Sequence, residues 1–124
     1  MPTDPTTTEF VVLRHEDREG VHYDLMIDTG AALATWKCSG PPESAGESPI
    51  FCRQIGDHRR AYLDYEGPIS GGRGEVRRHD RGHCEILNQS GDVWTVAFHG
   101  WKLNGLYELS RNEGDVWRLN PYAH

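Results

Sequence analysis

The sequence predicts an all-β fold, an antiparallel barrel or sandwich of short strands with little helix. Strand-forming segments follow one another along the chain, and short segments rich in Gly, Pro, Asn and Asp separate them. No stretch keeps the 3.6-residue periodicity of an amphipathic helix. The 124 residues are enough for one domain with one modest core.

The first two strands have the clearest sequence signals. Residues 9–15 (EFVVLRH) are rich in β-branched and aromatic side chains. Residues 21–28 alternate, so that His22, Asp24 and Met26 share one face and apolar residues share the other. Because only a short acidic loop joins these segments, we expect them to pair as a hairpin. Asp28-Thr29-Gly30 then predicts a turn into a third strand over residues 31–37.

The same signals predict the rest of the fold. Residues 39–49 are rich in Gly, Pro and Ser and predict a loop. Residues 1–8 are rich in Pro and Thr and predict a flexible tail, which leaves residues 9–120 as the single domain. The further strands are expected over residues 50–54, 60–65, 75–79, 84–87, 93–99, 106–111 and 116–119.

Composition and charge exclude several classes of protein. No apolar run approaches the roughly 18 residues of a membrane-spanning helix. The first residues have neither the basic nor the apolar part of a signal peptide, so we expect a cytoplasmic protein with no membrane partner. The net charge of −6 argues against a general nucleic-acid coat, which is usually basic. Cys38, Cys52 and Cys84 form no CxxC motif and indicate reduced thiols.

The charge is unevenly distributed along the chain. Residues 53–81 carry seven Arg and five acidic residues, a balance of +2, whereas the remainder carries −8. This imbalance predicts a local surface for an anionic ligand on an otherwise acidic body. The seven are Arg53, Arg59, Arg60, Arg73, Arg77, Arg78 and Arg81.

A metal-binding cluster is predicted where the first two strands meet. His22 and Asp24 project to the same side, about 7 Å apart at their bases. His15 closes the preceding strand, so pairing of the two strands brings it close to them. Two imidazoles and one carboxylate suit Mn, Fe or Zn and leave coordination positions open. From spacing alone, ordinary surface polarity is the more frequent explanation of an HxD pattern.

A second cluster is predicted from His58, Arg60 and Tyr62. If this segment is extended, the three side chains share one face. An imidazole, a guanidinium and a phenol together form a phosphate-binding surface. A solvated strand face beside an Arg-rich turn explains the same pattern at least as well.

Three further features have weaker functional readings. His79, His83 and Cys84 could supply zinc ligands, but no second Cys/His pair has the right spacing. The glycines around Arg73 resemble a phosphate-cradling turn only weakly, and we expect them to supply positive φ angles in a bend. They are Gly71, Gly72 and Gly74. The four tryptophans are expected to anchor the core. They are Trp36, Trp94, Trp101 and Trp117.

Five segments, spread over roughly residues 9–111, are the most distinctive parts of the sequence. In chain order they are FVVLRHEDREGVHYDLMID, TWKCSGPP, GDHRRAYLDYEGPI, HDRG and FHGWKLNGLYELSR. Together, with H-x6-HYD and DH-x3-Y as the most specific blocks, they resemble the 3'-phosphoesterase domain of bacterial DNA ligase D. The resemblance implies a compact antiparallel β-barrel. It also implies a manganese-dependent enzyme that trims ribonucleosides and phosphates from DNA 3' ends. We expect a free-standing relative, without the polymerase and ligase portions.

The resemblance also implies roles for individual residues. His15, His22 and Asp24 match the metal ligands, with manganese expected and zinc or another transition metal as the alternative. His58 and Tyr62 match the His and Tyr that contact the scissile phosphate. As imidazolium, His58 could bind a phosphate oxygen or protonate a leaving oxygen. The catalytic set expected on this basis is His22, His58 and Tyr62.

The sequence departs from the family pattern at three positions. Met26 stands where the family has an Arg that binds phosphate, and Leu13 stands in place of a Gln. The family Lys that follows the Trp motif has no clear counterpart, because Lys37 is too close to Trp36. The candidates to replace the lost charge are Arg14, Arg60 and Arg73.

Three functions follow from these observations. The first is a metal-dependent phosphoesterase that processes DNA 3' ends. The second is a non-catalytic module that keeps the barrel and metal site and binds nucleic acid or a repair protein, which Met26 favours. The third is a site adapted to a small phosphorylated molecule, which the negative net charge favours. The expected partners are a DNA 3' end or a phosphorylated small molecule, together with a separate ligase or polymerase.

Overall fold

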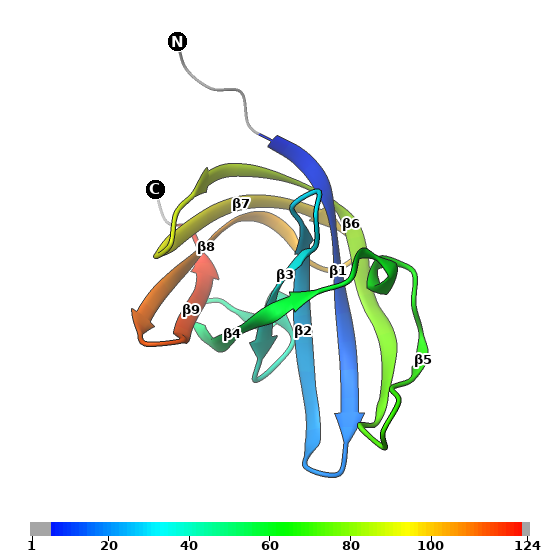
Figure 1. Cartoon of the computed structure of the whole chain (residues 1–124). Helices are drawn as coiled ribbons and strands as arrows, with labels where there is room; N and C mark the ends of the chain where they lie inside the picture. Colours follow the sequence, from blue (N-terminus) through cyan, green and yellow to red (C-terminus); the bar gives the residue numbers. More distant parts are fainter. Residues whose placement is uncertain (1–5, 123–124) are drawn as a thin grey trace.

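The computed structural model describes residues 6–122, which form a closed antiparallel β-barrel (Figure 1). The order around the barrel is β1-β2-β3-β4-β9-β8-β7-β6, and β6 pairs with β1 to close it. The predicted all-β class is confirmed, and the arrangement is a barrel. Helix within residues 6–122 is limited to two short 3₁₀ turns.

The elements of the described residues are as follows. The strands are β1 (Thr6–Asp17), β2 (Gly20–Asp28), β3 (Leu33–Cys38), β4 (Ile50–His58), β5 (Gly67–Pro68), β6 (Glu75–Gln89), β7 (Val93–Gly100), β8 (Asn104–Glu113) and β9 (Val116–Pro121). The 3₁₀ turns are η1 (Pro42–Ser44) and η2 (Arg60–Leu63). No helix among these residues has both the length and the apolar character needed to cross a membrane.

Strands β1 and β2 form the expected hairpin, and they are buried on both faces. Phe10 and Val12 of β1 point into the main core inside the barrel. Val11 and Leu13 alternate with them and point to the other side. This two-sided burial explains why the sequence of β1 is a continuous apolar run.

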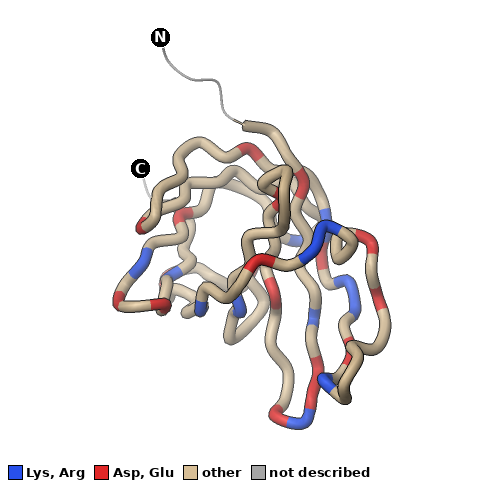
Figure 2. The backbone as a smooth tube through the Cα atoms, viewed as in Figure 1, with Lys and Arg blue, Asp and Glu red and all other residues tan. Residues whose placement is uncertain are grey.

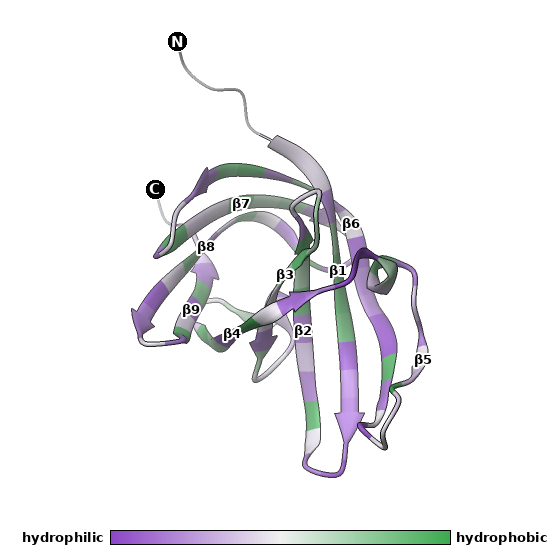
Figure 3. Ribbon diagram, viewed as in Figure 1, coloured by the Kyte–Doolittle hydropathy of each residue, from purple (hydrophilic) through white to green (hydrophobic). Residues whose placement is uncertain are grey.

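A second, smaller core therefore lies outside the barrel. It consists of Val11, Leu13, Met26, Leu33, Leu63 and Val76, with Tyr62 and Ile69 packed against it. The turn η2 and the segment that follows it cover this cluster. Figure 1 shows the β1–β2 hairpin and the adjoining part of β6 extending below the barrel, and in Figure 3 the lower end of β1 and the turn into β2 are hydrophilic.

Several predicted element boundaries are wrong. Residues 60–65 are not a strand, because Arg60–Leu63 forms η2 and buries Leu63 in the second core. Residues 75–79 and 84–87 belong to one long strand, β6. The strand β1 starts at Thr6, since Thr6–Thr8 pair with β6. The remainder of the expected tail, residues 1–5, lies outside the described residues.

The tryptophans are also only partly where we expect them. Trp36, Trp94 and Trp117 are buried and stack edge to face in the main core, as predicted. Trp101 is 64% exposed, so its assignment to the core is wrong. The fully buried Asp80 accepts the backbone N–H groups of residues 101–103, and the turn held in this way buries Leu103 in the main core and leaves Trp101 at the surface.

Candidate active site

The three predicted metal ligands meet at one point outside the barrel. His15 and His22 lie directly opposite each other in the β1–β2 register, and their ring centroids are 4.6 Å apart. Asp24 follows two residues after His22 and is buried between the two rings. One ligand atom from each residue lies within 4.8 Å of the other two. The hairpin register, which sets cross-strand neighbours on one face, produces this cluster.

The hydrogen bonding of the cluster leaves lone pairs on its nitrogen and oxygen atoms free to bind a cation. His15 Nε2 lies 2.7 Å from the Arg73 carbonyl oxygen, which can only accept, so Nε2 carries the hydrogen and Nδ1 has a free lone pair. His15 Nδ1 lies 3.5 Å from Asp24 Oδ2. Asp24 Oδ1 is buried without a hydrogen-bond partner among the described residues, although His22 Nε2 is 3.1 Å away. A divalent ion fits this arrangement, and a backbone carbonyl on the second nitrogen is the usual support of a metal-binding histidine.

His58 and Tyr62 face the cluster across a groove. A cavity of about 430 Å³ is lined by His15, His22, Asp24 and His58, among others. A second cavity of about 160 Å³ is lined by His15, Asp24, His58 and Tyr62. His58 Nδ1 donates to the Gly56 carbonyl at 3.1 Å, which leaves Nε2 for a ligand. The five predicted residues therefore border one connected groove, although η2 is helical and not extended.

The arginines of residues 53–81 divide into paired and unpaired groups. Five of the seven form ion pairs with carboxylates, and Figure 2 shows acidic residues interleaved with this basic segment. Within residues 6–122, Arg59 and Arg73 have no carboxylate partner. Arg73 lines both cavities beside His15, and its side chain is held by Ser70. Among these seven it is therefore the arginine best placed for an anion.

Two other predicted phosphate ligands do not line these cavities. Arg60 does not share a face with His58 and Tyr62, as we expected, because its guanidinium binds the buried carboxylate of Asp28 at 2.9–3.2 Å. This pairing lowers the pKa of Asp28 below its usual value. Arg14 is adjacent to His15 on β1, so its side chain points to the opposite face of the strand. Its guanidinium Nη1 lies 3.4 Å from Glu16 Oε1.

Lys37 is a residue of the groove that the sequence analysis did not assign. It lies opposite Asp24 in the β2–β3 register, on the same face of the sheet, and lines the larger cavity. Its ammonium group adds positive charge on the side away from Arg73. Its distance from Trp36 along the sequence does not match that of the family Lys. The pairing of β2 with β3, which sets Lys37 beside Asp24, is what identifies it as a groove residue.

Met26 lies at the floor of the smaller cavity. Its side chain is 1% exposed and packs in the second core, between Val11 and Thr35 in the strand register. The cavity wall that the family pattern assigns to an Arg is therefore apolar in this chain.

The cysteines, and the other histidines of residues 6–122, do not line this groove. Cys38 and Cys52 lie opposite each other on β3 and β4 with their sulfur atoms 3.0 Å apart, and the Cys52 thiol and burial raise the pKa of Cys38. Burial raises the pKa of Cys84 to about 12. Such thiols stay protonated and unreactive at neutral pH.

The predicted zinc ligands His79, His83 and Cys84 do not form a cluster. His79 binds Glu43 at 2.7 Å, whereas His83 stacks on His99. Among the described residues, the one group of three or more His, Cys, Asp or Glu side chains close enough to hold a metal is His15, His22 and Asp24.

Comparisons with known proteins identify related sequences. The mycobacterial relatives include "Multifunctional non-homologous end joining protein LigD" of Mycobacterium bovis and "Multifunctional non-homologous end joining DNA repair protein LigD" of Mycobacterium tuberculosis. Each is 28% identical over 116 residues, which is 87% of this chain and 15% of the relative. The chain thus spans a small part of their length. The model of the DNA ligase D 3'-phosphoesterase domain matches residues 13–111, and the chain belongs to this family.

Proposed function

We propose that this protein is a metal-dependent phosphoesterase that removes phosphate and ribonucleoside groups from DNA 3' ends. The observation that carries the proposal is the convergence of His15, His22 and Asp24 beside the unpaired Arg73 and the groove of His58 and Tyr62. Membership of the family supports the reaction class. Manganese is the ion we propose on the basis of the family, and the donor set of two imidazoles and a carboxylate suits it as well as iron or zinc.

The residues of the groove divide the work of phosphate-ester hydrolysis. His15, His22 and Asp24 would hold a divalent ion, which would neutralise charge on the phosphate oxygens. As an imidazolium whose Nδ1 donates to the Gly56 carbonyl, His58 would give its Nε2 proton to the leaving oxygen while a water molecule attacks the phosphorus. The Tyr62 hydroxyl donates to the phosphate and orients it.

A primer–template with a 3'-phosphate, incubated with Mn²⁺, tests the proposal. We expect free 3'-hydroxyl and inorganic phosphate with the wild type. His22→Ala should abolish turnover, and His58→Ala should lower it by about 10²–10⁴-fold, the usual contribution of general acid catalysis. His83→Ala, a histidine outside the groove, is the matched control and should retain activity. Wild-type product formation equal to that of His22→Ala would contradict the proposal.

The buried Met26 favours a second candidate function, a module that binds DNA 3' ends without cleaving them. An Arg contact to phosphate is strong, and its loss removes transition-state stabilisation. This alternative predicts that 3'-phosphorylated DNA binds to wild type and to His58→Ala equally well, with no product from either.

A further inference from the structure

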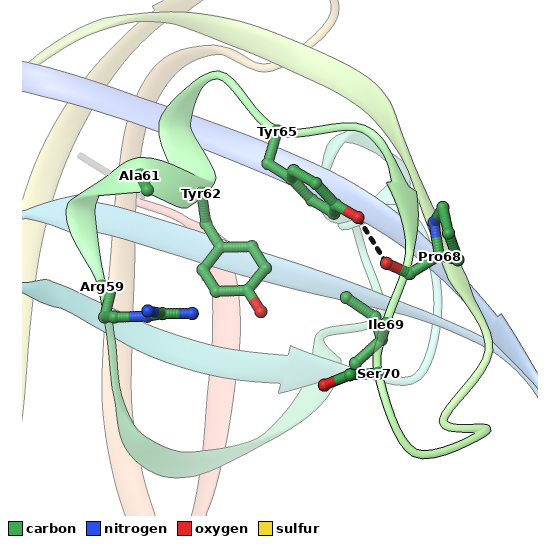
Figure 4. Close-up of a pocket in the computed structure, with 7 residues that line it drawn as sticks. All are labelled: Arg59, Ala61, Tyr62, Tyr65, Pro68, Ile69 and Ser70. Atoms are coloured by element: carbon green, nitrogen blue, oxygen red, sulfur yellow. Dashed lines mark hydrogen bonds between the residues drawn. The ribbon is translucent and has the colours of Figure 1, made fainter.

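A pocket next to the groove is lined by side chains that suit one planar ring system (Figure 4). It encloses about 230 Å³ between η2 and the segment that precedes β6. Tyr62 and Tyr65 meet edge to face there, with ring centroids 5.7 Å apart, and Ile69 completes the apolar wall. The volume is below the roughly 300–1,000 Å³ of pockets for drug-sized ligands, which suits a single ring system.

This pocket adjoins the smaller cavity of the groove. Tyr62 and Ile69 line both the pocket and the cavity that contains His15 and His58. Ring contacts lead from His58 to Tyr62 at 5.5 Å and from Tyr62 to Tyr65. A molecule with its phosphate beside His58 therefore presents its next chemical group to this pocket.

The polar groups of the pocket favour a nucleobase over an aliphatic group. The Tyr65 hydroxyl donates to the Pro68 carbonyl, which fixes the ring in place. Arg59 lies on the other side of Tyr62 in Figure 4, and its guanidinium has no carboxylate partner within residues 6–122. Tyrosine rings and guanidinium planes are the usual stacking partners of unpaired bases.

We propose that this pocket binds the base of the nucleoside whose 3' oxygen carries the scissile phosphate. The inference rests on the proposed function for the position of that phosphate. It assigns the substrate class as a nucleotide with an intact base and excludes simple phosphate esters as the preferred substrate. Because every base has a flat face, the pocket should accept all four bases.

Two primer–templates that differ only at the terminal nucleotide, which is unpaired in both, test the inference kinetically. One ends in adenosine 3'-phosphate, and the other ends in an abasic tetrahydrofuran 3'-phosphate. We expect wild type to process the adenosine end with a kcat/KM about tenfold higher, mainly through KM. Tyr65→Ala should bring the ratio close to one, whereas Tyr65→Phe, which keeps the ring, should preserve it. A wild-type ratio near one, or a ratio unchanged in Tyr65→Ala, would overturn the inference.

A titration that needs no turnover separates this inference from the proposed function. In NMR spectra of the metal-free protein, adenosine 3'-monophosphate should shift the signals of Tyr65 and Ile69, whereas inorganic phosphate should not. Circular dichroism of each variant checks the fold. Absence of turnover on both DNAs would contradict the proposed phosphoesterase activity. The titration would still test whether the pocket binds the base. Unmoved Tyr65 and Ile69 signals would overturn it even if the enzyme is active.

Discussion

Lys37 and Asp24 lie opposite each other on β3 and β2, so an ammonium group accompanies the carboxylate of the candidate metal centre. We expect Lys37→Ala to raise KM for 3'-phosphorylated DNA about tenfold, because a charge-assisted phosphate contact is lost. The chain has one other lysine, Lys102, which contacts His79 away from the groove, and Lys102→Ala is the control. Equal KM values for the two variants would exclude Lys37 from phosphate binding.

Met26→Arg tests whether the anion site lacks a charge. An arginine can pack its stem along the apolar wall and extend its guanidinium into the cavity of His15, Asp24 and His58. We expect kcat/KM to rise about tenfold, with a loss of about 1–3 kcal/mol in unfolding free energy from the larger buried side chain. Met26→Leu conserves volume and should change neither by much. Turnover that does not differ between the two variants would show that phosphate does not approach this position.

The ion pair of Asp28 and Arg60 makes stability depend on pH. The hydrogen bonds from Arg60 hold the pKa of the Asp28 carboxyl below 3.8 in the folded state. A carboxyl with a lowered folded pKa stabilises the fold above its unfolded pKa, and this contribution disappears as the pH falls through the folded pKa. Urea unfolding should therefore find Asp28→Asn less stable than wild type at neutral pH, with the difference shrinking below pH 3.8. Arg60→Ala should show the same convergence, and a constant difference at all pH values would contradict the assignment.

Asp80 should be among the residues most important for folding. Its buried carboxylate accepts four backbone N–H groups, those of Arg81, Trp101, Lys102 and Leu103. Replacing one oxygen with an amide NH₂ leaves buried donors facing each other, so we expect Asp80→Asn to lower the unfolding free energy by about 3 kcal/mol. Thermal and urea unfolding measure this loss. Asp92→Asn, at an exposed turn, should change stability by less than about 0.5 kcal/mol.

Gly74 and Gly72 offer a matched pair for the loop that carries Arg73. Both have positive φ angles, but a Cβ at Gly74 would lie 2.1 Å from the Glu16 carbonyl oxygen, whereas a Cβ at Gly72 meets nothing within 4 Å. Gly72→Ala should cost about 1 kcal/mol of backbone strain. Gly74→Ala should also displace the Arg73 carbonyl from His15 and weaken Mn²⁺ binding in calorimetry. Equal Mn²⁺ affinity in the two variants would show that this loop does not support metal binding.

The hairpin of the site was predictable because its signals are local. The alternation of residues 21–28 and the short loop before them determine that His15 and His22 become neighbours. The positive φ angles of Gly71, Gly72 and Gly74 also follow from glycine chemistry and are confirmed. Both features depend on residues a few positions apart, which sequence patterns describe well.

The errors arise where distant residues decide the conformation. The period of residues 60–65 fits a strand, but Asp28 on β2 and Arg81 on β6 hold Arg60 and the Leu63 carbonyl in a 3₁₀ turn. Trp101 is apolar and aromatic, yet Asp80, twenty-one residues earlier, holds its backbone at the surface. Lys37 joins the groove through strand register, which counting along one chain does not reveal.

The two apolar clusters on opposite sides of β1 and β2 separate the residues that stabilise the barrel from those that border the groove. The barrel interior maintains the architecture, while the groove draws its reactive groups from the outer side of the same strands. A substitution at the exposed position 37 therefore leaves the barrel interior untouched, whereas one at position 26 also alters the second core. The chemistry of the groove can thus be changed at its exposed positions while the interior packing that holds the strands together stays the same.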